Sequence, residues 1–387
     1  MPISRRKAIM SSTLLGSVLP LAAAGSARMK RAAAPLAPAD LAEFISVTDF
    51  ENAAQARLSP MSRALVAGGA ADEITVRWNR EAYDQLRLRN RVLVDVSKID
   101  TRLNLLGADL PHPILIAPTA YHRMIHPEGE VETARGAEQS GSLFVVSSAS
   151  NTRIGPIAAA TRQPLWFQMY VQSDRGFVKE VVAEVEKAGC RALVVTVDAP
   201  VVGPRYRQIR AKFKLTPGLE LPYMQDINKG RDSVLRGGNT RMTWDEIDWL
   251  RSITRLPVLL KGILDPDDAA RAAERAVAGI IVSNHGGRML DTAQASLIAL
   301  RAVTARVDRR TPVLVDGGIR RGTDILKALA CGASAVLIGR PVLQGLAVAG
   351  SAGVARVVAL LHDELEQAMA LTGRTQLSAI DRSVLWE

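Results

Sequence analysis

Eight short apolar segments recur between residues 113 and 340, and they constrain the fold more than any other feature. Continuous apolar runs of this length are typical of strands buried on both faces, as in parallel sheets. The segments are PILIAP (113–118), SLFVVSS (142–148), LWFQMY (165–170), ALVVTVD (192–198), PVLLKG (257–262), AGIIVSN (278–284), PVLVDGG (312–318) and SAVLIGR (334–340).

Amphipathic segments with helix signals lie between most of these runs. One begins at Asp174, a suitable N-cap, and ends at Gly189; another has Asp265 at the N-cap and Pro266 at the first helical position. A third covers Thr323 to Ala330 after a glycine-rich turn. Eight strand–helix repeats predict a (β/α)8 TIM barrel with its core at about 110–345. A doubly wound open sheet is the alternative, although it normally has fewer repeats.

Two further segments extend this core. Residues 39–69 have a helical pattern that Gly68 and Gly69 end, which predicts an N-terminal helical extension. Residues 199–256 are too long for a simple connection and predict an insertion after strand 4, acting as a lid or oligomer contact, with parts that move. After residue 27, we expect no stretch long and apolar enough to span a bilayer.

The first 27 residues resemble an export signal. Arg5, Arg6 and Lys7 precede a mildly apolar stretch, and residues 25–27 (GSA) suit cleavage. The paired arginines after Ser4 favour the twin-arginine route to the periplasm, which carries proteins already folded around a cofactor. A Sec signal or an uncleaved anchor is the alternative. The mature domain is then residues 28–387.

Charge and cysteine content exclude several classes of protein. The formal net charge is +10, but the basic residues are spread along the chain without aromatic interleaving, so we expect no nucleic-acid partner. Cys190 and Cys331 each precede a predicted strand, about half a barrel apart. We therefore expect no disulfide and no cysteine nucleophile, and the sequence has no Cys/His cluster at metal-ligand spacing.

Polar residues follow the apolar runs where active sites of this fold form, at the carboxyl ends of the strands. Each alone is compatible with a structural hydrogen bond, but the set indicates a site. These residues include Thr119, Ser147, Ser148, Gln168, Tyr170, Thr196, Asp198, Lys261, His285, Arg288, Asp316 and Arg340.

Three of these residues suit removal of a proton from a hydroxy acid, and a fourth suits a place beside a flavin. His285 can take a proton near neutral pH, and Asp198 can orient and stabilise its imidazole. Arg288 can clamp a carboxylate with two hydrogen bonds. Lys261 can stabilise negative charge on a reduced flavin, or alternatively form a buried ion pair.

The last two strand ends predict a phosphate site. They read DGGIRRGTD and IGRP, and their glycines let backbone N–H groups approach an anion. Arg320 and Arg340 can add charge-assisted contacts. The bound group is expected to be a cofactor phosphate.

These motifs together resemble the FMN-dependent α-hydroxy-acid oxidase and dehydrogenase family, from about Asp40 to the C-terminus. APTAYHRMIHPEGE, FQMYV, TVDAP, LLKGI, SNHGGRMLD, DGGIRRGTDILKALACGA and IGRP occur in family order. The resemblance implies His285 as the base with Asp198 as its partner, Arg288 and Arg205 on the substrate carboxylate, and Tyr170 on its hydroxyl. It implies an FMN site formed by Pro118, Thr119, Ala120, Ser147, Gln168, Thr196, Lys261, Asp316, Gly317, Gly318, Arg320, Gly339 and Arg340.

Two positions depart from the family pattern. Leu65 stands where the family usually has a tyrosine that helps bind the carboxylate, so that phenol hydrogen bond is missing unless Tyr121 or another group replaces it. Ala149 stands where glycolate oxidase has a large aromatic residue. We therefore expect a substrate larger or more apolar than glycolate.

The resemblance implies oxidation of an (S)-2-hydroxy acid to a 2-oxo acid, with electrons passing to the flavin and then to oxygen, a quinone or a cytochrome. It also implies a homotetramer. Three rivals stay open: a flavin enzyme acting on a peptide or amine, a non-catalytic flavin-binding protein, and an inosinate-dehydrogenase-like barrel. The last needs a cysteine in an active-site loop.

Overall fold

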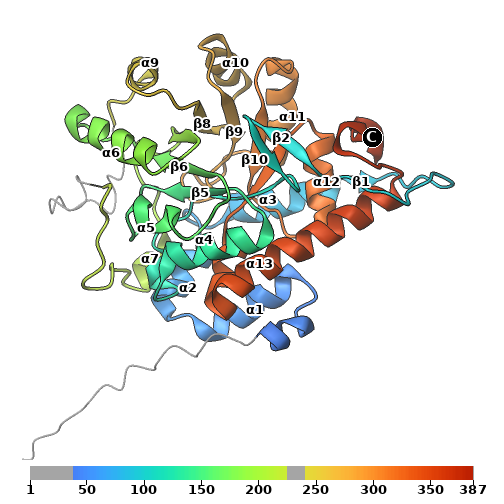
Figure 1. The fold of residues 1–387 in the computed structure, drawn as a ribbon, viewed down its shortest axis with the longest axis horizontal. Coiled ribbons are helices and arrows are strands. Elements are labelled where there is room, and N and C mark those ends of the chain that lie inside the picture. Colours follow the sequence, from blue (N-terminus) through green and yellow to red (C-terminus); the bar gives the residue numbers. More distant parts are fainter. Residues whose placement is uncertain (1–37, 225–239, 387) are drawn as a thin grey trace, which may run out of the picture. The chain divides into compact units, whose positions relative to one another are not determined.

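The computed structural model describes residues 38–224 and 240–386. Eight parallel strands form a closed barrel in the order β10-β11-β4-β5-β6-β7-β8-β9 (Figure 1). The closed barrel confirms the predicted (β/α)8 fold and rules out the alternative, a doubly wound open sheet. The strands are β4 (Ile114–Ile116), β5 (Phe144–Ser147), β6 (Leu165–Met169), β7 (Ala192–Thr196), β8 (Val258–Ile263), β9 (Gly279–Val282), β10 (Val313–Asp316) and β11 (Ala335–Ile338).

The barrel strands are apolar except near their carboxyl ends, because both of their faces are buried. In β10, Leu314 belongs to the cluster inside the barrel, whereas Val313 and Val315 pack toward the surrounding helices. A hairpin of β2 (Leu103–Leu105) and β3 (Ala108–Leu110) adds apolar side chains to the interior cluster. The interior is therefore a packed core, and chemistry is confined to the strand ends.

Helices follow most of the strands and begin close to the predicted caps. Asp174 caps α6 by accepting from the backbone N–H groups of Gly176 and Phe177, and Asp265 caps α10 in the same way. The third predicted helix begins one residue early, at Gly322. These helices are α4 (Gly129–Ser140), α5 (Ile154–Ala158), α6 (Arg175–Lys187), α9 (Trp244–Ser252), α10 (Pro266–Glu274), α11 (Ser296–Val307) and α12 (Gly322–Ala330).

The N-terminal extension contains several helices. A 3-10 turn (Pro38–Glu43) precedes α1 (Val47–Arg57) and α2 (Pro60–Ala67), and α3 (Ile74–Gln85) follows the glycine pair. Ser46 and Ser59 cap α1 and α2, so the helical pattern at 39–69 is divided at Leu58, whose backbone is extended.

Within 199–256, the structure shows α7 (Tyr206–Arg210) and α9, which leads into β8 as other helices lead into their strands. Residues 225–239 lie outside the described residues, so the expected movement of this segment stays a prediction. The proposed signal, residues 1–27, also lies outside them.

The long helix α13 (Arg340–Leu371) corrects one sequence expectation. By length and composition it is apolar enough to cross a membrane, but 67% of its most apolar window is buried inside the protein. It contacts α4, α1 and α12, and Figure 1 shows it running alongside α4. Its backbone leaves helical geometry at Ala349 and Gly350. The apolar side chains of α13 therefore pack into the protein core.

The chain ends beside the extension, where β12 (Leu385–Trp386) pairs antiparallel with β1 (Arg87–Leu88). Two 3-10 turns, Leu377–Ala379 and Arg382–Val384, precede β12.

Candidate active site

A cavity opens at the carboxyl ends of the barrel strands, with an empty volume of about 1250 Å³ that includes space open to solvent. It brings together all but three of the catalytic, substrate-binding and cofactor-binding residues that the family resemblance implies. Its lining includes Pro118, Thr119, Ala120, Ser147, Tyr170, Arg205, Lys261, His285, Arg288, Asp316, Gly317, Gly318, Arg320, Gly339 and Arg340.

His285 lines this cavity between two polar partners. Its Nδ1 lies 3.0 Å from the carboxylate Oδ1 of Asp198, and its Nε2 lies 3.4 Å from the hydroxyl of Tyr170. With Nδ1–H donating to Asp198, Nε2 keeps its lone pair for a proton. The turn that presents His285 is left-handed, with φ of 59° at the histidine and 63° at Gly286.

Burial and neighbouring charge set the protonation states of these groups. Burial lowers the pKa of His285, although the Asp198 carboxylate opposes this shift. For Asp198, burial is the largest single influence and would raise the pKa, but the charge and hydrogen bond of His285 together with the charge of Lys261 outweigh it and lower the pKa. Burial and the Asp198 charge raise the pKa of Tyr170. At neutral pH the site therefore holds a neutral imidazole, a carboxylate and a protonated phenol.

Two arginines give the cavity its positive charge beside His285. Arg288 donates from one guanidinium nitrogen to the carbonyl oxygens of Leu65 and Gly68, at 2.8 and 2.7 Å. The Nε of Arg205 is buried and has no hydrogen-bond partner in the described part of the chain. Burial lowers the pKa of both side chains. A carboxylate bound here would supply the missing partner and charge.

The loop after β10 and the start of α13 form the predicted phosphate site. Gly317 and Gly318 have φ values of 100° and 86°. Arg340, the first residue of α13, donates to the carbonyls of Val66, Gly68 and Gly286, so it is held in place. Glycine backbone, two arginines and a helix N-terminus are the usual components of an anion site.

Lys261 joins the strand ends of β8 and β10. Its ammonium lies 3.0 Å from Asp316 Oδ2 and 2.8 Å from the Ser283 hydroxyl, so the ion pair considered from the sequence is present. The other oxygen of Asp316 and the Nε2 of Gln168 are buried without a partner among the described residues. An FMN ring with polar atoms along its edge and a ribityl phosphate fits this arrangement of unpaired polar atoms and arginines.

Three predicted residues lie outside the cavity lining. Asp198 lies behind His285, and Gln168 accepts from the Ser147 hydroxyl at 2.8 Å. Thr196 lines a neighbouring cavity that shares Tyr170 and Ala199 with this one. Their predicted roles in catalysis and cofactor binding stay predictions.

Sequence reasoning missed other members of the site. Leu65 and Ala149 line the cavity, as their departure from the family pattern suggested, but Val202, Met224 and Met289 carried no recognisable signal. Cys190 and Cys331 are free, buried and outside the lining. Among the described residues no cluster suited to a metal ion occurs.

This fold and site define an oxidoreductase barrel with an anion-binding cofactor cavity and a histidine–aspartate pair beside it. A family model described as FMN-dependent dehydrogenase matches residues 54–387. The chain belongs to that family, whose members are FMN-dependent α-hydroxy-acid oxidases and dehydrogenases, and its cofactor is FMN.

Similar proteins support the assignment. The chain is 46% identical to an L-lactate oxidase of Nostoc sp., covering 88% of this chain and 98% of the relative. It is 42% identical to a 2-hydroxyacid oxidase of Dictyostelium discoideum, covering 90% and 91%. A solved structure of mandelate oxidase with (S)-4-hydroxymandelic acid is 37% identical, with a TM-score of 0.83, covering 88% of this chain and 98% of that one.

Proposed function

We propose that the protein oxidises (S)-2-hydroxy acids to 2-oxo acids, with His285 as the base. The observation that carries this proposal is the Asp198–His285–Tyr170 series. His285 and Tyr170 line the same cavity as Arg288 and Arg205, and Asp198 lies behind His285. In this arrangement His285 can take a proton, and the two arginines beside it can hold a carboxylate.

Each residue has a stated part in the reaction. Arg288 and Arg205 hold the substrate carboxylate, and Tyr170 donates to or accepts from the substrate hydroxyl. His285 takes a proton at Nε2, and Asp198 stabilises the imidazolium that results. FMN, when bound, supplies the acceptor for two electrons.

We further propose that the substrate is larger or more apolar than glycolate. Leu65 stands where the family usually has a phenol, and Ala149 stands where glycolate enzymes have a large aromatic side chain; both line the cavity. Other apolar residues of the lining extend the same surface, namely Ala199, Val202, Met224 and Met289. Relatives named for L-lactate and mandelate are consistent with such a pocket.

Anaerobic mixing with a series of 2-hydroxy acids tests both proposals. Bleaching of the flavin absorbance by one class of (S)-2-hydroxy acid supports the reaction and shows which size of substrate side chain the pocket accepts. Glycolate turning over faster than every longer acid would refute the size proposal. No bleaching by any acid, with FMN bound, would favour the peptide or amine rival or a non-catalytic flavin protein.

Reoxidation of the bleached enzyme identifies the electron acceptor. Names such as L-lactate oxidase among the relatives favour oxygen. Rapid reoxidation of the bleached enzyme on admitting air supports oxygen. Slow reoxidation in air, with fast reoxidation by a soluble quinone or cytochrome, would contradict it.

We also propose export through the twin-arginine route and assembly as a homotetramer. Ser4, Arg5, Arg6 and the apolar stretch that follows support export. Replacing both arginines by lysine should retain the protein inside the cell, and unchanged export would contradict the route. Sedimentation of the purified protein tests the tetramer.

A further inference from the structure

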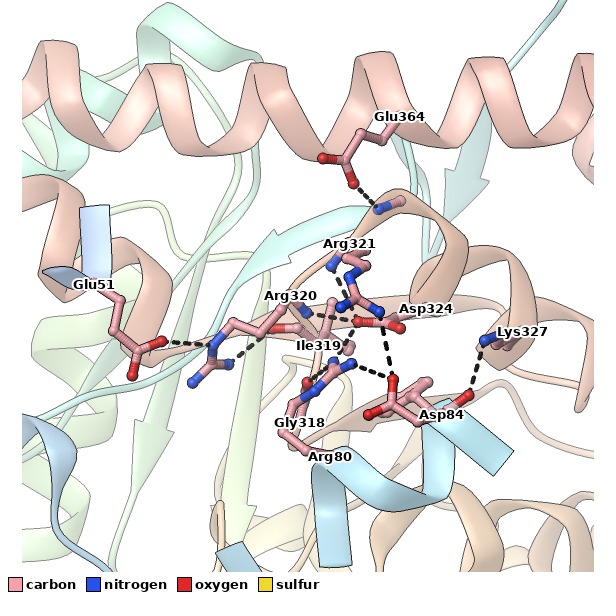
Figure 2. A network of polar contacts seen from close by, with 12 residues as sticks. Glu51, Arg80, Asp84, Gly318, Ile319, Arg320, Arg321, Asp324, Lys327 and Glu364 are labelled. Carbon is pink, nitrogen blue, oxygen red and sulfur yellow. Dashed lines mark hydrogen bonds and ion pairs between the residues drawn. The ribbon is translucent and has the colours of Figure 1, made fainter. Parts of the chain in front are cut away.

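Helix α3 lies against both functional loops of the barrel mouth, although the sequence analysis gave it no role. Asn79 and Arg80, adjacent on this helix, contact different loops. Asn79 reaches the loop that carries His285, and Arg80 reaches the phosphate loop at 317–321. Figure 2 shows the second of these contacts.

Arg80 ties the phosphate loop to a buried carboxylate. One of its guanidinium nitrogens lies 2.5 Å from the carbonyl oxygen of Gly318 and 2.5 Å from Asp324 Oδ2. Asp324 Oδ2 also accepts from the backbone N–H groups of Arg320 and Arg321, at 2.9 and 3.0 Å. The Asp324 side chain is 1% exposed. Arg80 and Asp324 therefore fix both ends of the segment that carries Arg320.

The contact between helix and loop leaves no room for adjustment. A Cβ on Gly318 would lie 2.2 Å from the backbone carbonyl oxygen of Asn79. The loop is thus seated directly on the backbone of α3. Its opposite side is held by Glu364 of α13, which accepts from the backbone N–H of Gly322 at 2.7 Å.

Asn79 makes the matching contact on the histidine loop. Its amide exchanges two hydrogen bonds with the amide of Asn284, at 2.9 and 2.8 Å. Asn284 directly precedes His285 and also accepts from the backbone N–H of Gly287 at 3.0 Å. Both asparagines are buried.

We propose that Asn79 and Arg80 are positioning residues, with Arg80 setting the phosphate loop for FMN and Asn79 setting the loop that presents His285. Neither residue lines the cavity, so each acts through another group. The proposal rests on the phosphate of FMN binding against residues 317–320, which is part of the proposed function.

The first test compares FMN with riboflavin, which is the same ring and side chain without the phosphate. Apoprotein of the wild type, Arg80→Met, Arg80→Lys and Arg77→Met is titrated with each ligand by flavin fluorescence. Arg77 is a matched control, because it is an exposed arginine on the same helix that donates to the Asp72 carbonyl.

Arg80→Met should weaken FMN binding by ~10-fold or more and leave riboflavin binding unchanged, because the lost hydrogen bonds involve charged groups. Arg80→Lys should recover part of the loss, since lysine keeps the charge but cannot make the same contacts. Arg77→Met should match the wild type. Equal weakening of both ligands would overturn the proposal, because it would show general destabilisation.

Two results separate this proposal from the proposed function. If the wild type binds FMN no better than riboflavin, the phosphate site itself is wrong. If the wild type prefers FMN and Arg80→Met keeps that preference, the site stands and the role of Arg80 is refuted.

A second measurement tests Asn79. Asn79→Ala, saturated with FMN, should reduce its flavin ~10-fold or more slowly, and the acidic limb of its pH–rate profile should move, because the histidine loop loses its support. A wild-type rate and profile in this variant would overturn its assigned role.

Discussion

Replacing Asp198 by asparagine should slow flavin reduction without emptying the site of cofactor. The carboxylate lies 3.0 Å from His285 Nδ1, and asparagine keeps its shape while removing its charge. At an effective dielectric constant of about 20, a unit charge about 4 Å from an imidazolium contributes about 4 kcal/mol. Allowing for a retained neutral hydrogen bond of about 1 kcal/mol, the barrier should rise by about 2–4 kcal/mol. This corresponds to a rate ~30- to ~1000-fold lower.

The pH dependence of the same variant has a definite sign. The Asp198 charge is the largest influence that opposes the lowering of the His285 pKa by burial. Its removal should lower that pKa further, so the base stays deprotonated to lower pH. The acidic limb of the pH–rate profile should therefore move to lower pH while the plateau rate falls.

The assay is anaerobic stopped-flow reduction of bound FMN at saturating substrate, over a range of pH. Asp267→Asn is the control, since its side chain is 84% exposed and forms an ion pair with the surface residue Arg306, outside the cavity lining. It should leave rate and profile unchanged. A plateau rate for Asp198→Asn within about threefold of the wild type, with an unmoved limb, would refute the assigned pair.

Leu65→Tyr should shift the kcat/KM ratio toward glycolate over a longer acid by ~10-fold, by adding a phenol and filling space; an unchanged ratio would contradict the pocket assignment. Lys261→Met should destabilise the apoprotein by about 3–5 kcal/mol, because it leaves buried Asp316 without its counter-charge. Chemical denaturation measures this loss, and a stability equal to that of the wild type would count against the ion pair. Gly318→Ala should abolish high-affinity FMN binding, since its Cβ would meet the Asn79 carbonyl at 2.2 Å, and a normal FMN titration would refute the close contact.

Local sequence determined the elements of the barrel and the residues at their ends. The length and pattern of the apolar runs identify buried parallel strands. N-cap residues such as Asp174 and Asp265 bind backbone N–H groups within three residues. Strands and helix starts can therefore be recognised without a structure. The same logic placed His285 and Lys261 at neighbouring strand ends. The export signal stays a prediction from sequence.

Tertiary structure alone decided how the N-terminal extension completes the site. Asn79 meets Asn284 across 205 residues, and Arg80 meets Asp324 across 244. Arg288 is oriented by carbonyls of Leu65 and Gly68. Such contacts depend on closure of the barrel and docking of α3 on its mouth. Hydrophobic period and capping are short-range signals, and they hold no information about which distant backbone atoms will meet.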